Sequence, residues 1–153
     1  MCVTTADEAR VAVESGADRL ELCAGIEVGG LTPSPGTFAE VRAVVAVPVW
    51  VLLRPTPGGF VYAPGAWAAV RRDADWFLSN GADGIVCGVL DAGGRLHRDR
   101  CRELVRAANG RATLHRALDF LPDLAAGLDA AIDLGFARVL TSGRERTALE
   151  GAA

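Results

Sequence analysis

The sequence contains no lysine, so arginine supplies all 16 of its basic side chains against 19 acidic ones. With a formal net charge of −3 and no basic stripe, the chain lacks the electrostatic footprint of a nucleic-acid-binding protein. No apolar run approaches the roughly 18 residues that a membrane helix needs. The N-terminus also lacks the charged and apolar regions of a signal peptide. We therefore expect a cytoplasmic protein with neither a nucleic acid nor a membrane as partner.

Cysteine is scarce and never occurs as a Cys-x-x-Cys pair. The four cysteines are Cys2, Cys23, Cys87 and Cys101. This spacing excludes zinc-ribbon and thioredoxin-like sites. In a cytoplasmic protein we expect free thiols rather than disulfides, and most free cysteines are small buried hydrophobes.

A junction of helix, glycine and strand is repeated along the chain. It begins at Gly16, at Gly81 and, in weaker form, at Gly135. The apolar patterns predict strands at 1–4, 19–23, 48–53, 84–88, 112–115 and 138–141. Helices are predicted between them, at about 6–15, 35–45, 65–79, 97–108 and 122–133. The chain therefore reads as one α/β domain, spanning 1–153, of about six βα units.

Two architectures fit this alternation. A closed (βα)8 barrel typically takes about 250 residues, and six units correspond to three quarters of one. An open, doubly wound, flavodoxin-like sheet is the alternative, but the first strand runs straight into a helix without a phosphate loop. We expect the first architecture: a TIM-like barrel truncated to about six βα units.

Polar side chains cluster at the predicted carboxyl ends of the strands, where parallel βα folds place their chemistry. The strand-end set is Glu21, Cys23, Arg54, His115, Arg116, Asp119, Thr141 and Ser142. His115 can act as a general acid or base, with Glu21 and Asp119 as further catalytic candidates. A structural ion-pair network, joining Glu21 to Arg54 and Asp119 to His115 or Arg116, is the alternative.

The same region offers donors for an anion. Arg54 and Arg116 supply guanidinium groups, and Thr141-Ser142-Gly143 supplies backbone N–H groups after the last strand. These five residues are the candidate ligand-binding set, and the ligand they predict is a small anionic, phosphorylated metabolite.

Six sequence blocks resemble the copper homeostasis family CutC, whose members are TIM-like barrels. They occur in family order at 17–23 (ADRLELC), 29–34 (GGLTPS), 53–55 (LRP), 81–86 with 88–90 (GADGIV, GVL), 113–119 (TLHRALD) and 138–143 (RVLTSG). The chain departs from the family in three places: Met1 precedes Cys2 where a Glu is usual, the loop 56–59 lacks an Arg and an Asp, and His97 replaces an Asp. Family members also continue through two more βα units.

The resemblance implies a copper association, and two thiols suit it. Cys2 and Cys23 lie near the ends of two strands that would be neighbours, about 4.8 Å apart. Cu(I) is soft and favours thiolates, so Cys2 and Cys23 are the candidate metal ligands, with Cys87 as a third. Two hypotheses follow: a copper-binding protein without turnover, and an enzyme or sensor for a small anionic metabolite. Because a six-stranded arc exposes two sheet edges, we also expect a homo-oligomer.

Overall fold

The computed structural model describes residues 1–152, and within them six strands form one parallel sheet. The strands are β1 (Cys2–Val3), β2 (Leu20–Leu22), β3 (Val49–Leu52), β4 (Gly84–Cys87), β5 (Ala112–Leu114) and β6 (Arg138–Val139). They lie side by side in their order along the chain. A doubly wound sheet would reverse its strand order at a switch point, so this sequential order excludes the flavodoxin-like alternative. The α/β prediction is confirmed.

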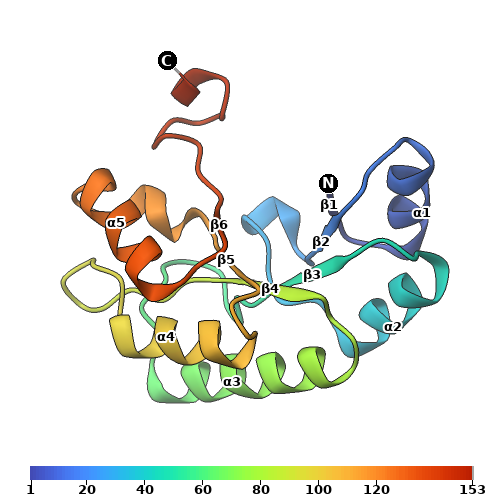
Figure 1. Cartoon of the computed structure of the whole chain (residues 1–153), viewed down its shortest axis with the longest axis horizontal. Helices are drawn as coiled ribbons and strands as arrows, with labels where there is room; N and C mark the ends of the chain where they lie inside the picture. Colours follow the sequence, from blue (N-terminus) through green and yellow to red (C-terminus); the bar gives the residue numbers. More distant parts are fainter. Residues whose placement is uncertain (153) are drawn as a thin grey trace.

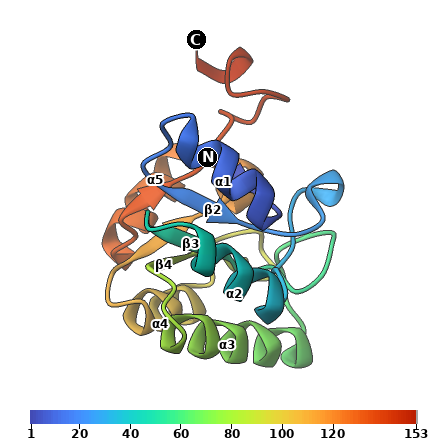
Figure 2. The same cartoon turned by 90° about the vertical axis from the view of Figure 1, so that its right-hand side faces the viewer.

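The helices lie in an arc along one face of the sheet (Figures 1 and 2). They are α1 (Ala6–Glu14), α2 (Pro35–Val44), α3 (Pro64–Ser79), α4 (Arg98–Ala107) and α5 (Leu124–Leu134). Short 3-10 helices η1 (Ile26–Val28), η2 (Arg116–Phe120) and η3 (Glu150–Ala152) lie in the connections and near the C-terminus. Among the described residues, no helix combines the length and the apolar character needed to cross a membrane.

Side-chain caps fix where several helices begin. The Thr5 hydroxyl accepts a hydrogen bond from the Glu8 backbone N–H at the start of α1. Ser34 caps α2 in the same way, and Asp123 caps α5. Each cap satisfies a backbone donor that the first helical turn leaves without a partner.

The two faces of the sheet carry different side chains because successive strand residues point in opposite directions. One face packs against the helices and joins the large core; its strand residues include Leu20, Leu22, Val49, Val51 and Ile85. The opposite, inner face carries a smaller buried cluster of Cys23, Trp50, Leu52 and Val86. The polar residues of the candidate site lie on this inner face or in the segments that come directly after its strands.

The last predicted strand is shorter than expected. β6 ends at Val139 rather than at residue 141, and the chain then extends away from the sheet (Figure 1). Thr141, Ser142 and Gly143 therefore lie in the loop that follows the sheet.

Candidate functional site

Cys2 and Cys23 come together on the inner face. The register pairs Cys2 with Glu21, so Cys23 lies diagonally across from Cys2 on the neighbouring strand. Their Sγ atoms are 3.3 Å apart. Cys2 is exposed, whereas Cys23 is only 1% exposed. The two thiols are therefore in contact, as the sequence predicts. The Cys2 sulfur can be reached from solvent, whereas the Cys23 sulfur is buried.

The two thiols differ in acidity. The hydrogen bond from Cys23 lowers the pKa of Cys2, because a donated hydrogen stabilises a thiolate. The same contact, together with burial, raises the pKa of Cys23. Cys2 is thus the sulfur that ionises first, and the Cys23 thiol, which keeps its proton, then donates to the Cys2 thiolate.

Glu21 lies beside this pair on the inner face. Its strand neighbours are Cys2 on one side and Trp50 on the other. Burial raises the pKa of the Glu21 carboxyl, although the Arg19 charge acts in the opposite direction. Arg19 and Arg138 each stack on the Trp50 ring, at 5.2 and 4.9 Å from the ring centroid.

Arg54 serves as a clamp between two loops. Its Nη1 donates to the carbonyls of Val28 and Gly30, and its Nη2 donates to Gly58. Within residues 1–152, no ion pair joins Arg54 to Glu21 or to any other carboxylate. The expected Glu21–Arg54 pair is wrong, because the loop carbonyls take the donors of the guanidinium terminus.

His115 is buried at the end of β5, with 3% of its surface exposed. Its Nδ1 accepts a hydrogen bond from the Ala117 N–H, which caps η2. The ring packs against Phe60, with 4.7 Å between the centroids. Burial lowers the pKa of His115 to about 4, because the charged imidazolium would lose its hydration.

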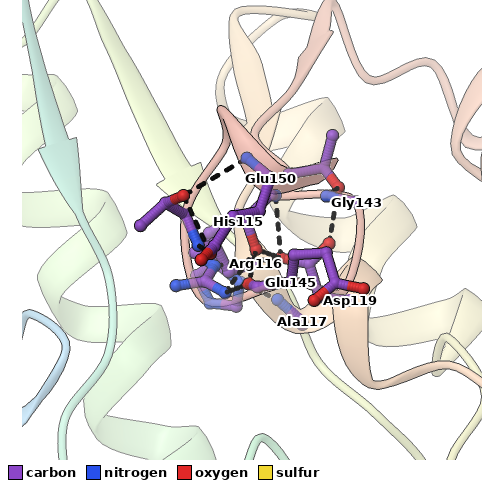
Figure 3. Close-up of polar contacts among 10 residues, drawn as sticks. His115, Arg116, Ala117, Asp119, Gly143, Glu145 and Glu150 are labelled. Atoms are coloured by element: carbon purple, nitrogen blue, oxygen red, sulfur yellow. Dashed lines mark hydrogen bonds and ion pairs between the residues drawn. The ribbon is translucent and has the colours of Figure 1, made fainter. Parts of the chain in front are cut away.

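Asp119 is bound by the residues predicted to bind a ligand (Figure 3). Its carboxylate accepts hydrogen bonds from the Thr141 hydroxyl, the Ser142 N–H and the Arg116 Nε. Burial alone would raise the pKa of Asp119, but these hydrogen bonds outweigh it and hold that pKa below its usual range. The Asp119–Arg116 ion pair of the structural alternative is confirmed, at 2.9 Å.

This network also uses the predicted anion cradle. The Gly143 N–H donates to the Thr141 hydroxyl oxygen, and Arg116 Nη2 donates to the Ser142 hydroxyl. The Asp119 carboxylate therefore takes the place that the sequence analysis predicts for an external anion. It also joins the loop after β5 to the loop after β6.

The remaining cysteines and the second histidine lie apart from these groups. Cys87 and Cys101 are fully buried in the main core, and burial raises the pKa of each thiol. The Cys101 side chain contacts the Val89 carbonyl. His97 precedes α4 and makes no side-chain cap there.

Sequence reasoning missed the residues that surround Arg54 and His115. Phe60 lies against both of them, with the Arg54 guanidinium carbon 5.3 Å from its ring centroid. Gly88 lies so close to His115 that a Cβ would come within 2.8 Å of the imidazole Cε1. The signal for Gly88 was present, because it directly follows β4, four residues after Gly84, and a glycine in or beside a strand marks a close approach.

The family model and the curated relatives name one family. The CutC family model matches residues 1–153. The family protein CutC of Treponema denticola is 42% identical over 153 residues, which cover 99% of this chain and 62% of the relative. Its counterpart in Rhizobium meliloti is 45% identical over 151 residues, covering 98% of this chain and 61% of the relative. The chain thus spans about three fifths of the length of these relatives.

A solved structure shows the same fold. The protein from Streptococcus agalactiae named as a copper homeostasis protein CutC superposes with a TM-score of 0.90 at 26% identity, covering 99% of this chain and 76% of that one. With a family model that matches every residue and relatives above 40% identity, this chain belongs to the CutC family.

Proposed function

We propose that this chain acts in copper homeostasis by binding Cu(I) between the thiolates of Cys2 and Cys23. The observation that carries the proposal is the 3.3 Å contact between the two Sγ atoms. The Streptococcus agalactiae protein, which shares the fold over 99% of this chain, is named for copper homeostasis, and this name supports copper as the metal.

The number of ligands favours Cu(I) over other metals. Structural zinc takes four protein ligands, and calcium or magnesium takes six or more oxygens. Within residues 1–152, no group of three or more His, Cys, Asp or Glu side chains is placed to hold an ion. Two thiols that are not part of a larger ligand group suit a soft ion of low coordination number.

The unequal exposure of the two sulfurs suits capture of an ion from a carrier. Exposed Cys2 can make the first bond to Cu(I), and buried Cys23 can complete the pair on a sulfur fixed by the core. Binding releases the thiol protons, since the thiolate is the ligand. We infer a cytoplasmic setting, where thiols stay reduced.

The test is a Cu(I) titration against a competing chelator under reducing conditions. We expect one Cu(I) per chain in the wild type and loss of binding in Cys2→Ser/Cys23→Ser. Cys101→Ala is the matched control, because it removes a thiol from α4 and leaves the pair intact. If the double variant bound Cu(I) as tightly as the wild type, Cys2 and Cys23 would not be the copper ligands.

We further propose that the sheet is the six-stranded part of a TIM-like (βα)8 barrel and that the chain forms homo-oligomers. The sequential strand order supports the first statement, since a barrel is wound in one direction. Within the described residues 1–152, β1 and β6 each have a neighbouring strand on one side only, which supports the second statement.

A further inference from the structure

Arg54 is a buried cation without a counter-ion. Its residue is 7% exposed, and its Nη atoms donate only to neutral backbone carbonyls. Among the ion pairs of residues 1–152, none includes Arg54. A buried charge is costly unless an opposite charge accompanies it. The fold therefore maintains a positive site that an anion would stabilise.

The pair Arg54 and His115 also holds two buried donors without acceptors. Arg54 Nε and His115 Nε2 are both enclosed and make no hydrogen bond within the described residues. Because Nδ1 of the imidazole accepts the Ala117 N–H, the ring hydrogen of neutral His115 is on Nε2. Both free atoms are thus N–H donors, and such atoms in a native protein call for an explanation.

The strand register places Arg54 and His115 at the same height along the strand direction. Leu52 pairs with Val86, and Val86 pairs with Thr113. Two residues further along each chain segment, on the same inner face, come Arg54, Gly88 and His115. Since Gly88 has no side chain, the His115 ring lies over this residue, which stands between His115 and Arg54 just past the end of β4, and its Cε1 is 2.8 Å from where a Cβ would stand.

Phe60 covers both groups. Its ring lies 4.7 Å from the His115 ring and 5.3 Å from the Arg54 guanidinium carbon. Phe60 is 8% exposed, whereas the preceding loop residues 56–59 are exposed and the adjoining Phe120 is 65% exposed. The Phe60 ring thus packs against both side chains at the end of an exposed loop.

We propose that Arg54 and His115 form a binding site for the carboxylate group of a small metabolite, with Arg54 Nε–H and His115 Nε2–H as donors and Phe60 as a cover that moves on binding. One positive charge and two N–H donors match the single charge and two oxygens of a carboxylate. A phosphate dianion brings more charge than one guanidinium balances, and three of the four Nη hydrogens of Arg54 are already bonded to loop carbonyls. The site is independent of the Cys2–Cys23 proposal.

The chain has two histidines, so NMR of the imidazole nitrogens gives a direct test. The probe is sodium acetate at pH 7, with sodium chloride at equal ionic strength as the reference and inorganic phosphate as a second arm. We expect the His115 signals to move saturably with acetate and the His97 signals to stay in place. The proposal is overturned if acetate causes no saturable change beyond that of chloride. Binding of phosphate but not of acetate would contradict the assignment of a carboxylate as the ligand.

Two histidine variants sharpen the test. In His115→Asn, the amide oxygen can still accept the Ala117 N–H, but the Nε2 donor is gone. We expect its affinity for acetate to fall about tenfold or more, the usual effect of losing a hydrogen bond to a charged group. His97→Asn is the matched control and should bind acetate like the wild type. Equal acetate affinity in His115→Asn would refute the assignment, and the wild-type titration decides the matter if that variant fails to fold.

Discussion

The Asp119 carboxylate accepts a hydrogen bond from the backbone N–H of Ser142, 23 residues further along the chain, at 3.1 Å. This contact closes the loop after β5 onto the loop after β6. The Asp119 side chain is 4% exposed and also accepts hydrogen bonds from Arg116 and Thr141. A carboxylate with several charge-assisted hydrogen bonds in a nearly buried position stabilises the fold around it.

Replacing Asp119 should therefore cost stability without affecting the thiol pair. We expect Asp119→Ala to lower the free energy of unfolding by about 3 kcal/mol, because the Thr141, Ser142 and Arg116 donors lose a nearly buried, charged acceptor. Urea unfolding at pH 7 measures the loss, and Cu(I) titration checks that Cys2 and Cys23 are unaffected. Asp129→Ala, on the exposed side of α5, is the control and should be nearly neutral. An Asp119→Ala protein of wild-type stability would show that the network is not structural.

Stability should also depend on pH through His115. Its pKa is about 4 in the folded protein, against about 6.5 for an ordinary histidine. Between these values the unfolded chain binds a proton that the folded chain does not, so acidification favours unfolding. This stability is fully present above pH 6.5 and is lost as the pH falls toward 4, by about 3 kcal/mol in total.

The comparison of wild type with His115→Asn isolates that contribution. Urea unfolding is measured from pH 7 to pH 4.5 in an amine buffer, which avoids carboxylate ligands. The difference in unfolding free energy between the two proteins should narrow steadily below pH 6.5. A difference that stays constant with pH would mean that His115 titrates normally in the folded state.

The sequence was sufficient to predict the sheet because its signals are local. Each glycine before a strand ends one helix and starts the next βα unit, and a pattern of this kind is visible without knowledge of distant contacts. Cys2 and Cys23 could be paired for the same reason, since consecutive strands of a βα fold are neighbours. The end of β6 was placed two residues too late, because apolar character at Leu140 does not reveal where pairing stops.

The polar part of the site was harder to predict because its partners are set by tertiary contacts. Nothing in the sequence shows that Asp119, rather than an external anion, accepts the donors of Ser142 and Arg116. Likewise, the clamp made by Arg54 depends on two loops that the sequence leaves without regular structure. The sequence thus identifies the polar side chains that meet at the strand ends. It does not reveal whether each of them is already bonded within the protein or is available to a ligand.

A close contact at Gly84 gives a further prediction. A Cβ there would lie 2.7 Å from the Arg111 carbonyl oxygen and from atoms of the Trp50 ring. The carbonyl belongs to the ladder between β4 and β5 and cannot move freely. Gly84→Ala should therefore destabilise the protein by about 2 kcal/mol, in the range of overpacked cores. Thermal and urea unfolding measure it, with Gly59→Ala as a control because a Cβ there meets nothing within 4 Å; equal stability of the two variants would contradict the packing argument.

The edges of the sheet predict self-association. Within residues 1–152, β6 pairs only with β5, and Val139 and Leu140 beside its other edge are 40% and 41% exposed. An unpaired strand flanked by apolar side chains is a template for another chain.

Sedimentation velocity at increasing protein concentration should show assemblies larger than one chain. Val139→Asp should shift them toward the monomer, because a charge at the edge opposes pairing. Val61→Asp, which charges an exposed valine in the loop before α3, should leave the assembly unchanged. A wild-type protein that sediments as a monomer at every concentration would contradict both the prediction and the proposal that these edges mediate oligomerisation.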